Sequence, residues 1–218
     1  MKNFLKKYRH TYILSYMFVY FAWFLILENR SNVNFYYMHS VVDDYIPFME
    51  VFVVPYILWF IYISATVLYL LFTSKKDYYQ CCAFLFIGMT ICLIIYTIWP
   101  NAQNLRIDSF PRDNFLTDLV KMFYTCDTST NVCPSIHCFN SIGAHIAIWR
   151  CPNLKNKPWI RYGSLILAIS ICLSTVFIKQ HSFIDLVCGI ILAAIMYVLV
   201  YRIDYSKFYK TKASVTSN

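Results

Sequence analysis

Six apolar stretches, separated by shorter polar segments, follow one another along the chain of 218 residues. They cover residues 11–27, 46–72, 81–99, 136–149, 159–178 and 184–201. Most of them reach the roughly 17–25 residues that a helix needs to cross a bilayer. The pattern therefore predicts an all-α, polytopic membrane protein with six transmembrane helices, folded as a single domain over residues 1–218.

The fourth stretch differs from the others because it is short, with about 14 residues, and polar at its start. The polar side chains there are Pro134, Ser135, His137, Asn140 and Ser141. A helix that begins below the membrane surface and lines a cavity has this pattern. The alternative is a helix buried in the core of a soluble protein, and the five neighbouring apolar stretches argue against it.

Composition supports the membrane interpretation. The chain is 59% hydrophobic, 19% aromatic and only 14% charged, whereas a soluble domain has nearly twice that share of charge. The same figures, with only 4 glycines, exclude a disordered, collagen-like or small disulfide-rich chain. The net charge of +8 is then a question of distribution along the chain, and we expect membrane lipid rather than nucleic acid as the partner.

The basic residues alternate between successive connections. Four Lys or Arg precede or begin the first stretch, two lie at 73–80, four at 150–161 and four in the C-terminal tail. By the positive-inside rule, both termini are cytoplasmic, and residues 100–135 and 179–182 face the outside. Glu28-Asn29-Arg30 follows the first stretch in place of a small-residue cleavage site, so we expect an uncleaved anchor.

The nine cysteines form no CxxC pair and no metal-ligand spacing. Cys126 and Cys133 lie together in the outer segment, and they would form a disulfide if that side of the membrane is oxidising. We expect the remaining cysteines, most of which lie in the apolar stretches, to pack as small hydrophobic side chains.

Ionisable groups at membrane depth are costly, so each of them is a candidate for function. Two clusters stand out, at residues 133–137 and at residues 174–185, and both fall at the outer ends of their stretches. About 40 residues separate them in sequence, yet the topology brings them to one face. We therefore predict an active site at the outer, non-cytoplasmic face.

Five residues suggest phosphate chemistry. His181 and Asp185 are spaced i, i+4, so the carboxylate can fix the tautomer of the imidazole and leave its other nitrogen free as a nucleophile or base. Ser135 and His137 lie at a helix start, where free N–H groups favour an anion. Arg106 has a guanidinium suited to phosphate oxygens. Taken singly, these features also fit a structural hydrogen bond, an ordinary Ser N-cap and an interfacial arginine.

Together these residues resemble the motifs of the type 2 phosphatidic acid phosphatase superfamily, which also includes vanadium haloperoxidases. Pro134-Ser135-Ile136-His137 resembles the Pro-Ser-Gly-His motif, and Ser174-Thr175-x5-His181-x3-Asp185 keeps the spacing of Ser-Arg-x5-His-x3-Asp. Residues 99–106 resemble the Lys-x6-Arg-Pro motif in their arginine. The three segments occur in the family order, and the six-span topology covers nearly the whole chain.

The chain departs from those motifs at four positions, which are Trp99 for Lys, Ile107 for Pro, Ile136 for Gly and Thr175 for Arg. The change at Ile136 is also found in branches that resemble sphingomyelin and inositol phosphorylceramide synthases. Two phosphate-binding cations are therefore missing. Lys179 is the first candidate to replace one of them, although it also fits a lysine that snorkels to the interface, and Arg112 is a second, less suited candidate.

The resemblance implies phosphoryl transfer with neither metal nor cofactor. It gives His181 the role of nucleophile, Asp185 that of orienting it, and His137 that of general acid and then base. Arg106, Ser135 and Lys179 would bind the phosphate. The implied activity is that of a lipid phosphate phosphatase, which hydrolyses a lipid phosphate or prenyl diphosphate through a phosphohistidine, and we expect it in a bacterial cytoplasmic membrane.

Two alternatives stay open. The first is a phosphotransferase that moves a lipid headgroup phosphate to an alcohol acceptor, and the second is a non-catalytic, lipid-binding membrane scaffold. His145 lies about 12 Å along the helix from His137, too far to reach the same phosphorus. We expect His145 to form a hydrogen bond between helices.

Overall fold

A computed structural model describes residues 9–204, so most of the basic N-terminal and C-terminal residues, 1–8 and 205–218, lie outside the described part. The chain is mostly helical. The α-helices are α2 (Tyr16–Glu28), α3 (Val41–Tyr45), α4 (Val53–Thr73), α5 (Lys75–Ile98), α6 (Phe115–Cys126), α7 (Ile136–Arg150), α8 (Pro158–Phe177) and α9 (Phe183–Tyr197). Shorter helical turns are η1 (Arg9–Ser15), η2 (Glu50–Phe52), η3 (Pro152–Leu154) and η4 (Val198–Arg202), and the two strands are β1 (Tyr36–Tyr37) and β2 (Asn101–Ala102).

Five helical segments are long and apolar enough to cross a membrane, namely Arg9–Glu28, Glu50–Thr73, Lys75–Ile98, Pro158–Phe177 and Phe183–Arg202. They correspond to five of the six expected spans. The remaining expected span, at residues 136–149, corresponds to α7, which has only 15 residues, or about 22 Å of length. It falls short of the bilayer thickness, in keeping with its polar start.

One boundary differs markedly from the expectation. Residues 73–80 were expected to form a basic turn, but α5 already begins at Lys75, so Ser74 alone separates it from α4. The hydroxyl of Ser74 accepts a hydrogen bond from the backbone N–H of Asp77 at 3.4 Å. This N-cap starts the helix six residues before its apolar run, because a cap and not hydrophobicity determines where a helix begins.

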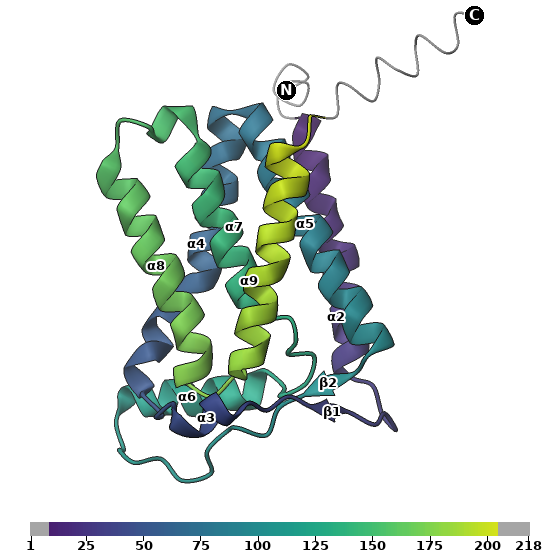
Figure 1. Cartoon of the computed structure of the whole chain (residues 1–218), viewed down its shortest axis with the longest axis vertical. Coiled ribbons are helices and arrows are strands. Elements are labelled where there is room, and N and C mark those ends of the chain that lie inside the picture. Colours follow the sequence, from purple (N-terminus) through teal and green to yellow (C-terminus); the bar gives the residue numbers. More distant parts are fainter. Residues whose placement is uncertain (1–8, 205–218) are drawn as a thin grey trace, which may run out of the picture.

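The long helices form an upright bundle around α7 (Figure 1). This central helix packs against α4, α5, α8 and α9, whereas α2 packs against α5 at one side. The described chain begins and ends at one end of the bundle, here called the terminal end, while α3, α6 and the two strands lie across the opposite end, here called the loop end (Figure 1).

The contact between α5 and α7 depends on two glycines that face large aromatic rings. A Cβ atom at Gly88 would lie 1.9 Å from the ring of Phe139, and one at Gly143 would lie 2.5 Å from the ring of Phe84. The two rings stack on each other with centroids 5.0 Å apart. Each helix thus accommodates a ring of the other, which fixes α7 in the centre of the bundle.

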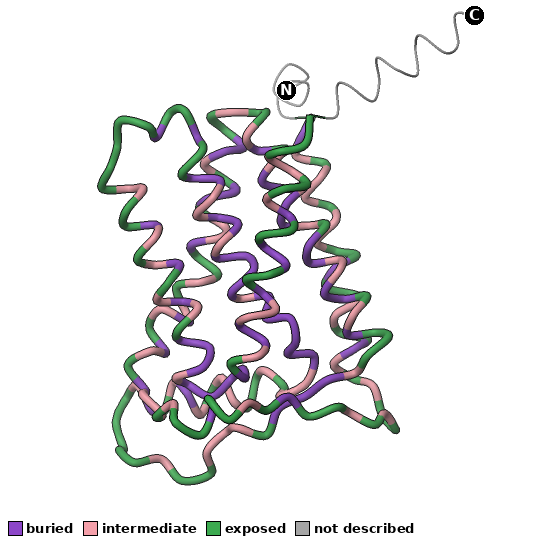
Figure 2. Tube along the Cα trace, viewed as in Figure 1, coloured by how far each residue is buried: buried purple, intermediate pink, exposed green. Residues whose placement is uncertain are grey.

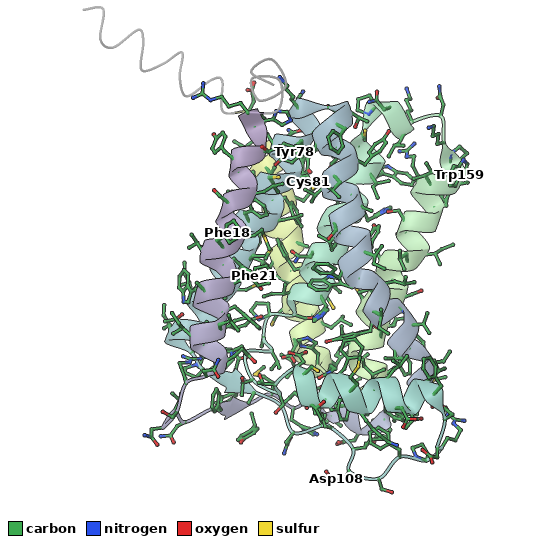
Figure 3. The ribbon with its side chains drawn as sticks, turned by 180° about the vertical axis from the view of Figure 1, so that it is seen from behind. Phe18, Phe21, Tyr78, Cys81, Asp108 and Trp159 are labelled. Atoms are coloured by element: carbon green, nitrogen blue, oxygen red, sulfur yellow. The ribbon has the colours of Figure 1, made fainter. Side chains whose placement is uncertain are left out.

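The outer surface of the bundle is apolar. Exposed and buried residues alternate along the long helices, as the colours of the tube show (Figure 2). Phe18 on α2 and Trp159 on α8 lie on the outside, whereas Tyr78 and Cys81 lie between helices (Figure 3). Phe18 is 81% exposed, which water would disfavour and lipid would not. The chain is an integral membrane protein.

The loop end contains structure that hydrophobicity did not reveal. Strands β1 and β2 pair in parallel, with Tyr36 opposite Asn101, and Thr130 forms an antiparallel bridge to Ala102. Helix α6 lies across this end in a segment that was expected only to face the outside (Figure 1). It is amphipathic and too short to span, so the search for long apolar runs passed over it.

Asn101 holds the chain that leads into α7. Its side-chain oxygen accepts hydrogen bonds from the backbone N–H groups of Val132 and Cys133, both at 2.8 Å. Its amide nitrogen donates to the carbonyls of Trp99 and Cys133, both at 3.0 Å. The side chain is fully buried, and all of these contacts act on the two segments that meet before Ser135.

Cys126 and Cys133, which would form a disulfide if the outer side is oxidising, are both free in the structure. Cys126 is the exposed last residue of α6, whereas Cys133 is buried with Met38 and Val132 and packs against Cys188 of α9. The two thiols are thus in different surroundings, one in solvent and one in an apolar cluster.

Candidate active site at the loop end

The structure brings the two polar clusters together at the loop end. His137 lies in the first turn of α7, and His181 lies in the connection between α8 and α9. Their rings meet edge to face, with centroids 5.6 Å apart. The two rings are therefore in contact, as the sequence predicted from the convergence of the clusters.

His181 is fixed by the start of α9. Its Nδ1 lies 3.4 Å from Oδ2 of Asp185, and the same oxygen accepts the backbone N–H of Ser182 at 2.9 Å. Ser182 and Asp185 form a capping box, so the carboxylate is buried and held by the helix terminus itself. Burial lowers the pKa of His181, but its hydrogen bond to Asp185 and the charge of that carboxylate outweigh this and leave the pKa raised.

Ser135 is the N-cap of α7. Its hydroxyl accepts the backbone N–H of Cys138 at 3.4 Å, and its own N–H donates to the carbonyl of Asp185 at 3.0 Å. This second bond joins the starts of α7 and α9 directly. The approach is close enough that a Cβ atom at Gly189 would lie 2.8 Å from the Ser135 carbonyl oxygen.

Aromatic side chains of α4 enclose His137. The ring of Tyr56 stacks on it at a centroid distance of 4.7 Å, and that of Trp59 lies at 4.3 Å. Within residues 9–204, neither ring nitrogen of His137 has a hydrogen-bond partner in the protein. The ring is therefore oriented by packing alone, and its nitrogens stay available to a ligand. Sequence analysis missed both aromatic residues, because they resemble the many other aromatic residues of the apolar stretches.

Arg106 reaches the same region from the loop between β2 and α6. Its terminal nitrogens donate to the carbonyls of Tyr124, Asp127 and Thr128 at 2.8–3.0 Å, and to Oε1 of Gln180 at 2.6 Å. Gln180 immediately precedes His181, so the guanidinium is tied to the connection that carries His181. Its pKa is lowered by burial.

Three buried N–H donors near the two histidines lack a partner within the described residues. They are Nε of Arg106, Nε2 of Gln180 and Nε1 of Trp59. A buried donor without an acceptor costs about 1–3 kcal/mol, so three of them in one region need an explanation. These three donors suit a ligand with several acceptor oxygens, such as a phosphate, whereas Oδ1 of Asp185 is an unpartnered acceptor in the same region.

Residues 108–209 match the PAP2 superfamily. This range contains His137, His181 and Asp185 with the spacing of the family motifs. The match covers just under half of the chain. It confirms the type 2 phosphatidic acid phosphatase resemblance at the level of the family, whose chemistry is phosphatase-like. No curated protein and no solved structure matches the chain.

Lys179 was the first candidate to replace a missing phosphate-binding cation, and its ammonium binds backbone carbonyls. It donates to the carbonyls of Asp43 and Ile46 at 2.9 and 2.6 Å. Arg112, the second candidate, pairs with Glu50, with Nε 2.6 Å from Oε1 and Nη2 2.8 Å from Oε2. Both substitute cations are therefore engaged by protein groups, the ammonium through two of its three N–H donors.

Asp127 is an acidic residue near the histidine pair that sequence analysis did not single out. Its Oδ2 accepts the hydroxyl of Tyr56 at 3.2 Å, and Tyr56 stacks on His137. Burial raises the pKa of Asp127, against the opposing effects of His181 and Arg106. The charged groups close to the pair thus include the guanidinium of Arg106 and the carboxyl groups of Asp127 and Asp185.

The other histidine of α7 behaves as expected for a structural residue. Nδ1 of His145 lies 3.1 Å from Oγ of Ser164 on α8, and Ser164 in turn lies 2.6 Å from the hydroxyl of Tyr62 on α4. The predicted hydrogen bond between helices is confirmed.

Within residues 9–204, no three His, Cys, Asp or Glu side chains are grouped as metal ligands.

Proposed function

We propose that this protein is a lipid phosphate phosphatase that hydrolyses a lipid phosphate or prenyl diphosphate without a metal, through a phosphohistidine on His181. The observation that supports it best is the pair of histidine rings with centroids 5.6 Å apart in a chain that matches the PAP2 superfamily. Asp185 on Nδ1 of His181 leaves Nε2 free to act as a nucleophile.

The reaction has two displacements at phosphorus. Nε2 of His181 attacks the phosphorus while the bond to the leaving oxygen breaks, and His137 gives that oxygen a proton. Water then attacks the phosphohistidine, His137 takes a proton from it, and the P–N bond breaks to restore His181. Each proton transfer by a positioned side chain contributes about 10²–10⁴-fold in rate.

The unpartnered donors would bind the equatorial phosphate oxygens. Nε of Arg106, Nε2 of Gln180 and Nε1 of Trp59 are the candidates, together with the start of α7 at Ser135. Such fixed donors stabilise a developing charge better than mobile water does, because they need no reorganisation. Lys179 is not included, since two of the three N–H groups of its ammonium donate to backbone carbonyls.

The membrane arrangement follows from the same proposal. We place α7 as a sixth, short crossing, with both termini in the cytoplasm and the loop end facing outward in a bacterial cytoplasmic membrane. The substrate headgroup would enter at the loop end while its tail remains in lipid beside the exposed apolar faces.

A second candidate is a phosphotransferase, in which an alcohol replaces water as the acceptor. The cations expected from the family motifs are missing at positions 99 and 175, and Asp127 adds a carboxyl group near the site. This charge balance suits the single charge of a phosphodiester better than the double charge of a phosphomonoester. The third candidate is a non-catalytic, lipid-binding scaffold, which turnover in either assay below would exclude.

The test is phosphate release by detergent-purified protein with EDTA present. The panel contains phosphatidic acid, phosphatidylglycerol phosphate and a prenyl diphosphate, and a parallel panel offers phosphodiester lipids with and without an alcohol acceptor. We expect His181→Ala to lose on the order of 10³-fold or more while staying folded, because the nucleophile is gone. Release by His181→Ala at the wild-type rate would refute the mechanism, and acceptor-dependent turnover alone would select the phosphotransferase. No turnover in either panel would favour the scaffold.

A further inference from the structure

Asp43 is a buried carboxylate in the half of the chain that the family match does not cover. It lies in α3 at the loop end, next to the connection that carries His181 (Figure 1). Only 3% of it is exposed. A carboxylate is rarely buried to this extent unless hydrogen bonds or charges compensate it, so its partners reveal what it is for.

The carboxylate binds the start of α9. Oδ1 accepts the backbone N–H of Phe183 at 2.7 Å, and Oδ2 accepts the hydroxyl of Ser182 at 2.5 Å. Oδ2 also accepts the N–H of Ser40, which caps α3. Asp43 therefore holds the two residues that directly follow His181, although about 140 positions separate them in sequence.

A second tie holds the residues on the other side of His181. The ammonium of Lys179 donates to the carbonyls of Asp43 and Ile46 at 2.9 and 2.6 Å. Lys179 itself has a φ of 57°, in the left-handed region, where the chain turns out of α8. The backbone N–H groups of Gln180 and His181 both donate to the carbonyl of Thr175 at 2.9 Å. His181 thus lies between two points at which α3 and the residue after it hold the connection.

We propose that Asp43 is a positioning residue that, with Lys179, clamps residues 179–183 and so sets the direction of the His181 ring. The clamp acts through Ser182, whose N–H binds the same Asp185 carboxylate that orients His181. The proposal rests on the proposed function, since it takes His181 as the nucleophile. Misplacing a reacting group by about 1 Å can cost about 10²-fold in rate, so the clamp acts on kcat rather than on substrate binding.

The first test compares Asp43→Asn with Asp44→Asn. Asp43→Asn keeps the size of the side chain but places an amide where Oδ2 accepts two hydrogen bonds. Asp44 is the matched control, because it neighbours Asp43 yet its side chain is 62% exposed and pairs only with His39 among the hydrogen bonds of the described residues. We expect Asp43→Asn to lower kcat by about 10- to 100-fold with KM within about two-fold. Asp44→Asn should match the wild type.

Lys179→Met provides an independent variant if Asp43→Asn folds poorly. Methionine keeps the apolar stem and removes the ammonium, so the clamp predicts a fall in kcat with little change in KM. A rise in KM with kcat unchanged would return Lys179 to the role of a phosphate ligand and contradict the clamp. Equal kcat values for Asp43→Asn and Asp44→Asn in folded protein would overturn the proposal outright.

A second readout does not depend on turnover. The ¹⁵N signals of the His181 ring, assigned with His181→Gln in histidine-labelled protein, should shift in Asp43→Asn and stay unchanged in Asp44→Asn. If the wild type turns over no substrate, the proposed function fails, and these signals still decide whether the clamp sets the ring. Unchanged signals in both variants would refute the clamp.

Discussion

The two histidines of α7 lie towards different ends of the bundle, and they differ in whether the protein binds their ring nitrogens. His145 has a hydrogen-bond partner on α8, and that partner is bonded in turn to α4. His137 is enclosed by two aromatic rings and by His181, and its nitrogens have no protein partner within residues 9–204. Two residues of one kind on one helix thus differ in whether the protein already uses their nitrogens, and this difference separates the structural His145 from His137, the proposed general acid and base.

The sharpest test of this comparison is the pair His137→Asn and His145→Asn. An amide cannot donate or accept a proton at neutral pH, so we expect His137→Asn to lower kcat for lipid phosphate hydrolysis by about 10²–10⁴-fold. Steady-state phosphate release with EDTA present measures it. A loss of similar size in His145→Asn would remove the distinction between the two positions.

The orientation of His181 gives the next largest effect. Asp185→Asn removes the carboxylate charge that raises the pKa of His181 and leaves only a neutral amide oxygen as acceptor, while the burial that lowers the pKa remains. Below this pKa the ring is protonated and cannot attack phosphorus, so the rate falls as the pH drops through it. We expect kcat to fall by about 100-fold and the acidic limb of the pH–rate profile to move to lower pH. The charge of Asp127 also raises the pKa of His181, but less than Asp185 does, so it does not cancel this shift.

The pH–rate profile of kcat/KM for wild type and variant measures this shift. An acidic limb that stays in place would mean that His181 is not the group that titrates. A limb that moves to higher pH would contradict the direction assigned to Asp185.

The close approach of α7 and α9 at the loop end predicts a smaller, structural effect. A Cβ atom at Gly189 would lie 2.8 Å from the Ser135 carbonyl, whereas one at Gly163 on α8 would meet nothing within 4 Å. We expect Gly189→Ala to lower the free energy of unfolding by about 1–3 kcal/mol through overpacking. Gly163→Ala should raise it by about 0.5–1 kcal/mol, because alanine favours the helix.

Denaturation in detergent, followed by circular dichroism, measures both glycine variants. If Gly189→Ala is as stable as Gly163→Ala, the two helix starts are not packed as closely as the structure has them.

The smallest effect belongs to His145. We expect His145→Asn to change phosphate release by less than about two-fold and to lower the free energy of unfolding by about 1 kcal/mol, the net value of one hydrogen bond. The same two assays measure it. If the activity of His145→Asn falls by more than its folded fraction does, then His145 affects the site at the loop end by a route other than stability.

The long helices could be predicted from the sequence because a bilayer imposes one length and one composition on them. The meeting of His137 and His181 could be predicted too, because motifs and topology place them on one face. The position of the Lys179 ammonium could not be predicted, because its partners are the backbone carbonyls of Asp43 and Ile46. Every residue has a backbone carbonyl, so the sequence does not reveal which ones a lysine will bind.

The aromatic residues around His137 escaped prediction for a different reason. Tyr56 and Trp59 lie in an apolar stretch where an aromatic residue is equally typical of lipid contact. Only the rotation of α4 in the bundle distinguishes the two roles, and packing against α7 determines that rotation. Asp127 and Asp43 lie in segments without periodic patterns, so their contacts depend on the fold of the loop end.

Asn101 has a consequence for the range of sequences that this fold permits. Both acceptor positions of its oxygen and both hydrogens of its amide are used by backbone groups around it. Aspartate has the shape but no donor, leucine has neither donor nor acceptor, and glutamine is one methylene too long for the same four contacts. In a library carrying every amino acid at position 101, selected only for folded protein, asparagine should be the residue that survives.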